Sequence, residues 1–323
     1  MSVKNILITD RFSQESLISL QQQTFLKVEK SPFPNLEQTD ISEVHGLIIR
    51  SRTLITEDLL KRAKNLQVIV TATSGFDHID LHATEKWGIT VMHTPEANVE
   101  SAAQLAWSLL LTGSRKIVES HKQVKSGTWQ RDLLMGTELE GKTLGIVGLG
   151  RIGRRVAQIA KAFRMQVLAY DPYLDENIFI QEGCTRSSYE ELLKCSDFLS
   201  FHVPRTKLTQ NMLNRSHFEY IHRGIGIINV SRGGVIHELD LAQALTEGWL
   251  AFCALDVYEK EPLDRNSNLL KFSNVILTPH IGANTYEAFA KASDQAAILV
   301  LKFFMDGSTE NTLPPKSAWY LEA

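Results

Sequence analysis

Three side chains that follow apolar runs in the second half of the chain could together carry out an acid–base reaction. Arg232 lies in IINVSRGGVIHE, Glu261 in CALDVYEKEP and His280 in NVILTPHIGANT. Arginine is a planar, bidentate partner for carboxylate and carbonyl oxygens. Histidine titrates near neutral pH, and a neighbouring carboxylate favours its protonated form. The set suits hydride exchange at a 2-hydroxy acid, with Arg232 as the cation, His280 as the acid or base and Glu261 as its orienting partner.

Each of these residues also has an ordinary interpretation when it is taken alone. An arginine beyond a strand can simply be a surface cation, an acid after a strand is often a solvated loop residue, and a single loop histidine is usually inert. The interpretation as a catalytic set depends on a cofactor site elsewhere in the same domain.

Such a site is indicated by GKTLGIVGLGRIGRRVAQIA, which starts at residue 141 and has the pattern of a strand, a glycine turn and a helix. Gly148 permits a tight turn, Gly150 lets the backbone approach a pyrophosphate, and Gly153 lets the helix pack on the strand. Glycines also mark plain turns, but the next apolar run ends at Asp171, which suits the adenosine ribose. No Lys or Arg lies between Asp171 and Arg186, so NAD is favoured over NADP.

Alternating strand and helix patterns must position these motifs. Before the glycine turn, strands are expected at 5–9, 46–49, 68–72 and 89–92, with helices around 14–23, 56–64 and 80–87. A long amphipathic stretch then covers 100–126. Six further strands are expected at 143–148, 166–170, 198–203, 225–230, 251–257 and 275–278, followed by a helix over 287–301. This alternation predicts an α/β fold with parallel sheets covered on both faces.

Composition sets limits on the function. The chain has 323 residues, 43% of them apolar and 22% charged, which suits an ordinary globular protein of two domains. A net charge of −3 argues against a nucleic-acid-binding surface. No run of 18 apolar residues predicts a membrane span, and the amino terminus lacks a signal-peptide pattern, so the cytoplasm is expected. Three cysteines without CxxC spacing suggest buried thiols, with no metal site.

Seven motifs, in their order along the chain, resemble those of the D-isomer-specific 2-hydroxyacid dehydrogenase family, most closely its 3-phosphoglycerate dehydrogenase branch. They are SGFDHID, TPEANVESAAQLAWSLL, WQRDLLMGTELEGKTLGIVGLGRIG, HVPRT, NVSRGGVI, ALDVYEKEP and TPHIGANT. The resemblance covers nearly the whole chain. It implies an NAD-dependent enzyme that interconverts a D-2-hydroxy acid and a 2-keto acid, with 3-phosphoglycerate and 3-phosphohydroxypyruvate, the serine-biosynthesis pair, as the expected substrates.

The resemblance also implies two doubly wound domains: a flavodoxin-like substrate domain at 1–98, an inserted Rossmann NAD-binding domain at 99–286, and a segment at 287–323 that returns to the first domain. Hinges near 95–100 and 285–290 would allow closure, and the region 99–126 with Trp129 would form a homodimer. The implied catalytic residues are Arg232, Glu261 and His280. The implied cofactor residues are Gly148, Gly150, Arg151, Ile152, Gly153, Asp171, Val203, Pro204, Val230, Ser231, Asp256 (at the nicotinamide) and Gly282. The implied substrate residues are Arg50, Ser51, Ser74, Gly75 and Arg131, with backbone N–H groups of Ser74 and Gly75 on the carboxylate.

Some positions depart from the phosphoglycerate pattern. Relatives often carry an arginine where this chain has Thr71, and a glutamate where it has Gln104. Arg131 could pair with Glu138 or Glu140 rather than hold a phosphate. The chain ends at Ala323, so a short form without a regulatory domain is expected. The alternative substrates are glyoxylate, hydroxypyruvate or pyruvate, and a more remote alternative is an NAD(H)-sensing, corepressor-like binding protein.

Overall fold

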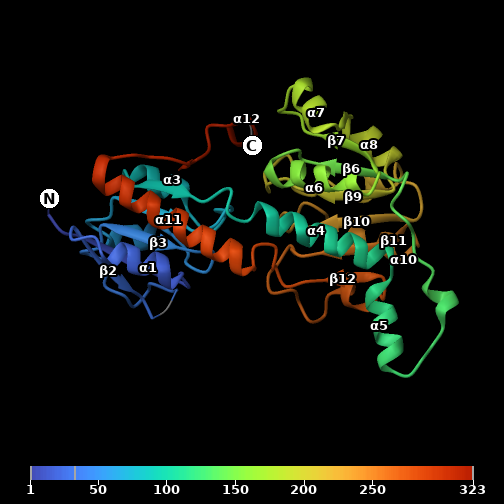
Figure 1. The fold of residues 1–323 in the computed structure, drawn as a ribbon, viewed down its shortest axis with the longest axis horizontal. Coiled ribbons are helices and arrows are strands. Elements are labelled where there is room, and N and C mark those ends of the chain that lie inside the picture. Colours follow the sequence, from blue (N-terminus) through green and yellow to red (C-terminus); the bar gives the residue numbers. More distant parts are fainter. Residues whose placement is uncertain (1, 33, 322–323) are drawn as a thin grey trace. The chain divides into compact units, whose positions relative to one another are not determined.

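The computed structural model describes residues 2–32 and 34–321, which form two compact units. Unit 2 is Val99–Gly282, and unit 1 joins the described residues before Val99 to those from Ala283 onward. Each unit is built on its own, mostly parallel sheet, of six strands in unit 1 and seven in unit 2 (Figure 1). The predicted α/β class with two doubly wound sheets is confirmed.

Unit 1 has the strand order β13-β5-β4-β3-β1-β2, in which only β13 is antiparallel to its neighbour. Its strands are β1 (Lys4–Ile8), β2 (Leu26–Lys30), β3 (Gly46–Ile49), β4 (Val68–Thr71), β5 (Thr90–His93) and β13 (Thr312–Leu313). Its helices are α1 (Gln14–Gln21), α2 (Glu57–Arg62), α3 (Leu81–Lys86), α11 (Tyr286–Asp306) and α12 (Ala318–Leu321).

Successive side chains of these strands point to opposite faces of the sheet, and both faces are buried. Leu47 and Ile49 of β3 pack on one face with Leu59 of α2. Ile48, between them, packs on the other face with Leu20 of α1 and with Ala296 of α11. Helix α11, drawn in red, lies beside α1 in Figure 1. The carboxyl-terminal helix is thus a structural part of unit 1.

Unit 2 has the strand order β12-β11-β10-β9-β6-β7-β8, with all strands parallel. Its strands are β6 (Thr143–Val147), β7 (Gln166–Tyr170), β8 (Thr185–Arg186), β9 (Phe198–Phe201), β10 (Ile225–Asn229), β11 (Leu250–Leu255) and β12 (Val275–Leu277). Its helices are α4 (Val99–Ser114), α5 (Ile117–Lys125), α6 (Arg151–Ala162), α7 (Glu176–Glu182), α8 (Tyr189–Cys195), α9 (Arg215–Phe218) and α10 (Glu238–Thr246), with 3-10 turns η1 (Arg131–Leu134) and η2 (Asn268–Lys271).

The predicted amphipathic stretch 100–126 is two helices rather than one. Lys116 interrupts it in the left-handed region, with a φ of 49°. Helix α4 packs into the core of unit 2 through residues such as Ala106 and Trp107, whereas no residue of α5 is buried. Only α4 therefore serves the core of its own unit.

Both sheets change winding direction once, and this determines where a ligand can bind. Beyond that point the connections run the opposite way, which leaves a crevice at the carboxyl ends of the two strands concerned. In unit 1 these strands are β1 and β3, and in unit 2 they are β6 and β9. Among the described residues, no helix has both the length and the apolar character needed to cross a membrane.

Candidate active site

The glycine turn after β6 forms the first wall of the site in unit 2. Gly148 has a φ of +90°, and a Cβ placed there would lie 2.7 Å from the carbonyl oxygen of His202. A Cβ on Gly153 would lie 2.1 Å from the carbonyl oxygen of Gly148, so α6 can approach β6 only because this residue is glycine. A Cβ on Gly150, by contrast, would meet no atom within 4 Å. The backbone at Gly150 therefore faces open space.

Helix α6 starts directly at this open space, with Arg151 and Ile152 in its first turn. The first turn of a helix presents backbone N–H groups and the positive end of the helix dipole. Together with the glycine turn, this is the arrangement that binds the pyrophosphate of a dinucleotide.

Asp171 follows β7 and takes part in shaping the turn. Its Oδ2 accepts a hydrogen bond from the Leu149 N–H over 3.0 Å, and its Oδ1 accepts one from the Tyr173 N–H over 3.1 Å. A carboxylate has about four acceptor positions, so both oxygens can still accept from ribose hydroxyls. Binding of the ribose by Asp171 stays a prediction from the sequence, and its contacts within the turn were not predicted.

Val203 and Pro204 follow β9, and Val230 follows β10. The Cγ1 atom of Val203 would lie 2.7 Å from a Cβ on Gly148, so this side chain lies directly beside the glycine turn. Val230 is buried. Since β6, β9 and β10 are neighbours, these apolar residues lie along the same edge of the sheet.

Arg232 lies in a turn that the buried Asn229 holds in place. The Asn229 Oδ1 accepts from the N–H and the hydroxyl of Ser231, over 3.0 and 2.7 Å, and its Nδ2 donates to the Arg232 carbonyl over 3.0 Å. A Cβ on Gly233 would lie 1.6 Å from the carbonyl oxygen of Tyr258, so the turn lies directly against the chain after β11. Asn229 was not singled out from the sequence, although it lies in the NVSRGGVI motif.

Asp256, just after β11, is fully buried and connects that strand to the histidine loop. Its Oδ1 accepts from the Thr278 hydroxyl over 2.6 Å and from the Ile281 N–H over 2.8 Å, and its Oδ2 accepts from the Gly282 N–H over 2.8 Å. Its carbonyl accepts from the His280 N–H over 2.9 Å. The family resemblance implies that Asp256 lies at the nicotinamide; the structure adds that its carboxylate holds the loop that carries His280.

Glu261 and His280 form the direct side-chain pair of the site. The Nδ1 of His280 lies 2.7 Å from Oε2 of Glu261, while Oε1 of Glu261 accepts from the Tyr258 N–H over 3.2 Å. A carboxylate on Nδ1 makes that nitrogen the donor and leaves Nε2 for proton exchange. The His280 side chain is 50% exposed and can reach a ligand. Its backbone φ of 52° places it on a tight turn.

Arg232, Glu261 and His280 follow β10, β11 and β12, which are consecutive neighbours in the sheet. The topology therefore brings all three to one edge, at the end of the crevice beyond the glycine turn. The model of the D-isomer specific 2-hydroxyacid dehydrogenase NAD binding domain matches residues 107–282. The chain belongs to this family. Unit 2 is accordingly its NAD-binding domain.

Individual relatives of this dehydrogenase family agree. The chain is 39% identical to D-3-phosphoglycerate dehydrogenase of Archaeoglobus fulgidus over 285 residues, which are 88% of this chain and 54% of the relative. The D-lactate dehydrogenase of Aquifex aeolicus, solved with NAD and lactic acid, is 30% identical with a TM-score of 0.85 and covers 97% and 100% of the two chains. A glyoxylate reductase from Paecilomyes thermophila is 26% identical with a TM-score of 0.88 and covers 97% and 99%. The chain spans about half the length of the curated relatives it matches.

The expected substrate residues Ser74 and Gly75 form the turn after β4 in unit 1. The turn is held from its side: Nδ1 of His93 lies 2.9 Å from the Ser74 carbonyl, and the Thr73 hydroxyl donates to the Gly75 carbonyl over 2.7 Å. None of the hydrogen bonds among the described residues uses the backbone N–H of Ser74 or Gly75. These N–H groups can serve a carboxylate.

Thr71, where relatives often carry an arginine, is fully buried at the end of β4. Its hydroxyl lies 2.6 Å from that of Thr73 and 3.0 Å from Nε2 of His78. The residue is part of the support for the Ser74 turn, and it supplies no positive charge.

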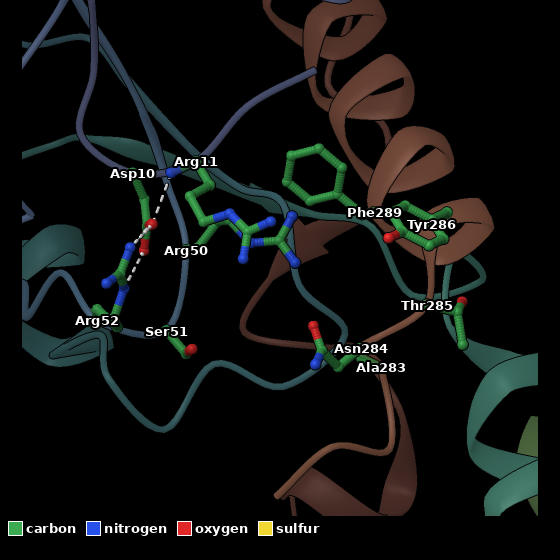
Figure 2. A pocket seen from close by; sticks show the side chains of 10 residues that line it. All are labelled: Asp10, Arg11, Arg50, Ser51, Arg52, Ala283, Asn284, Thr285, Tyr286 and Phe289. Atoms are coloured by element: carbon green, nitrogen blue, oxygen red, sulfur yellow. Dashed lines mark hydrogen bonds and ion pairs between the residues drawn. The ribbon is translucent and has the colours of Figure 1, made fainter.

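Arg50 and Ser51 follow β3 in unit 1 and line a pocket (Figure 2). Arg131 lies in η1 of unit 2 and is exposed. The alternative pairing of Arg131 with Glu138 or Glu140 is not found among the described residues, and Arg164 binds the Glu140 carboxylate at 2.7 Å. The structure thus brings Glu261 and His280 into contact, places Arg232 at the same sheet edge, and positions Arg50, Ser51, Ser74 and Gly75 on a separate unit.

Proposed function

We propose that this protein is an NAD-dependent dehydrogenase that interconverts 3-phosphoglycerate and 3-phosphohydroxypyruvate. The observation that carries the reaction type is the 2.7 Å contact between Glu261 and His280 at the edge of the NAD-binding sheet. The carboxylate fixes the imidazole by Nδ1, so Nε2 is the atom that takes the proton from the substrate hydroxyl, or returns it to the keto oxygen. NAD, when bound, accepts or supplies the hydride.

Arg232 is the proposed cation for the carboxylate and the reacting oxygen of the substrate. Its turn is held rigidly by Asn229, and a guanidinium can bind two oxygens at once. The turn at Ser74 and Gly75 is the proposed site for the substrate carboxylate on the other unit. Unit 1 is therefore the proposed substrate domain, and the segments joining the units near residues 98 and 283 are the proposed hinges.

The phosphate is assigned to Arg131 and Arg50. Arg131 is an exposed cation that no carboxylate of the described residues neutralises, and Arg50 carries a buried Nη1 that has no hydrogen-bond partner among them. The similarity to named phosphoglycerate dehydrogenases supports the same substrate. A second candidate, reduction of glyoxylate, hydroxypyruvate or pyruvate, is favoured by the uncharged, buried Thr71.

The quaternary state and location belong to the same proposal. Trp129 and Met135 are 75% and 78% exposed on the segment after α5, which makes this segment a candidate homodimer surface. Cys184 and Cys253 are buried free thiols, whereas Cys195 is an exposed one, contrary to the expectation that all three are buried. The proposed location is the cytoplasm, a reducing compartment that suits an exposed free thiol.

A panel of 2-keto acids with NADH tests the function. The reaction is followed by the absorbance of NADH at neutral pH. We expect the highest kcat/KM with 3-phosphohydroxypyruvate. A preference for hydroxypyruvate or glyoxylate would favour the second candidate. NADH binding without turnover of any acid in the panel would instead indicate an NAD(H)-sensing protein.

A further inference from the structure

A pocket of about 480 Å³ opens within unit 1, and it is lined mainly by charged and polar side chains. This volume is within the range of small-molecule sites in proteins. Figure 2 shows the lining residues, which come from three segments: Asp10, Arg11, Arg50, Ser51, Arg52, Ala283, Asn284, Thr285, Tyr286 and Phe289. All of them belong to unit 1.

The topology places this pocket where a ligand is expected. Asp10 and Arg11 follow β1, and Arg50 to Arg52 follow β3, so two of its walls come from the carboxyl ends of the strands at which the sheet changes direction. The third wall is the start of α11, a helix of 21 residues whose positive dipole end adds to the field there. Crevices of this kind bind ligands in open α/β sheets.

The charges of the pocket are unequal, since three arginines face a single carboxylate. Arg52 occupies that carboxylate: its Nε donates to Oδ2 of Asp10 over 3.1 Å, and its Nη2 donates to Oδ1. Burial acts to raise the pKa of Asp10, but the Arg52 hydrogen bond and the Arg11 N–H outweigh burial and hold that pKa below its usual value. Asp10 is thus an ionised partner of Arg52, and positive charge remains at Arg11 and Arg50.

Arg11 and Arg50 gather on one aromatic ring. Their guanidinium carbons lie 5.4 and 5.2 Å from the centre of the Phe289 ring, and Figure 2 shows both groups beside that ring. Burial lowers the pKa of Arg50, the charge of Asp10 opposes this, and the charges of Arg11 and Arg52 add to the lowering. The Nη1 of Arg50 is buried and has no hydrogen-bond partner among the described residues. Two like charges held together with an unused donor are suited to a doubly charged anion.

We propose that Arg11 joins Arg50 in binding the phosphate group of the substrate in this pocket, and that Arg11 is a residue that determines specificity for the phosphorylated acid. Arg11 then provides the positive charge that Thr71 does not. That this phosphate group belongs to the substrate rests on the proposed function. That the pocket binds a phosphate group rests on the pocket itself. The Arg52–Asp10 pair has a positioning role, because Arg52 occupies both carboxylate oxygens of Asp10.

The test compares Arg11→Met, Arg11→Lys and the control Lys4→Met in the full chain. Lys4 is also a cation over a phenylalanine, 5.9 Å from the Phe304 ring centre, but it begins β1 and so lies at the opposite end of that strand. We expect Arg11→Met to raise the KM for 3-phosphohydroxypyruvate about tenfold or more, as for a lost hydrogen bond to a charged group, with less than about a twofold change for hydroxypyruvate. Arg11→Lys should recover part of the loss, and Lys4→Met should change neither constant.

Calorimetric titration with inorganic phosphate separates this inference from the proposed function. The wild type should bind phosphate, and Arg11→Met should weaken that binding about tenfold or more, even if no 2-keto acid is turned over. An equal rise of KM for both acids, or an unchanged phosphate affinity in Arg11→Met, would overturn the role of Arg11. If Arg11 binds phosphate but the enzyme prefers hydroxypyruvate, the pocket does not hold a phosphate group of the substrate. Free phosphate would then be its ligand.

Discussion

At the scale of single residues, the proposed acid–base role of His280 rests on its contact with Glu261. His280→Ala should lower kcat about 10²- to 10⁴-fold, the usual contribution of a positioned acid–base group. NADH affinity, measured by fluorescence titration, should be retained because the glycine turn does not depend on His280. Glu261→Gln should lower kcat less, since the amide oxygen of glutamine can still accept from Nδ1.

The matched control for His280→Ala is His222→Ala, another exposed histidine of unit 2, whose Nδ1 lies 3.1 Å from the carbonyl of the adjacent Arg223. Its kcat should equal that of the wild type. If His280→Ala retained the wild-type kcat as well, the assignment of His280 as the acid–base group would be wrong.

A second histidine, His202, should make stability depend on pH. Burial lowers its pKa from 6.5 to about 3, and its Nε2 lies 2.8 Å from the Ser200 hydroxyl. The unfolded chain therefore binds a proton between these values that the folded chain does not. Above about pH 6.5, neutral His202 costs the folded state nothing. As the pH falls below this value, the free energy of unfolding declines by at most about 1.4 kcal/mol per pH unit for this one group. In urea unfolding between pH 7 and pH 5, His202→Gln should lose less stability on acidification than the wild type, and an identical pH slope would contradict the prediction.

At the scale of elements, two glycines between β6 and α6 should have different roles. Gly153 is expected to serve packing, and Gly150 is expected to serve cofactor binding. Gly153→Ala places a Cβ 2.1 Å from the Gly148 carbonyl, so it should force α6 away from β6 and lower the Tm of the protein without cofactor. Gly150→Ala places its Cβ in open space at a φ of −73°, so the Tm should change little while NADH binding weakens. Thermal unfolding with and without NADH distinguishes the two effects. A lower Tm of the Gly150→Ala variant, or normal NADH binding by this variant, would argue against a phosphate site at Gly150.

At the scale of the whole molecule, the segment from α5 to Met135, just after η1, has exposed apolar side chains that its own unit does not cover. They are Ile117, Val124, Trp129, Leu133 and Met135. Sedimentation should give twice the chain mass of 36.3 kDa at micromolar concentration. Trp129→Asp with Met135→Asp should give the monomer, whereas Leu239→Asp, an exposed leucine on α10, should leave the dimer intact. A wild type that sediments as a monomer would refute the dimer.

All ten expected strands are present. Most of them lie inside a sheet, and runs such as VIVT in β4 and FLSF in β9 are buried throughout. Strand β12 is the exception, because the sequence predicted it although it is a half-buried edge strand. The three missed strands are edges: β2 buries only Leu26, β8 is fully exposed, and β13 has two residues. An edge strand forms because a neighbouring strand offers it backbone hydrogen-bond partners. Its side chains need not be apolar for this, so the sequence pattern need not predict it.

The sequence was enough to predict the glycine turn, the acid after β7 and the three candidate catalytic residues, since each depends on residue type at a fixed distance from a buried strand. Which groups meet became visible only in the folded chain. It paired Glu261 with His280 across 19 residues, bonded Asp256 to the loop 25 and 26 residues later, and gathered Arg11, Arg50 and Phe289 in one pocket. Parallel strands bring their carboxyl ends to one edge whatever their separation in the chain, so such contacts follow from strand order, which local patterns do not encode.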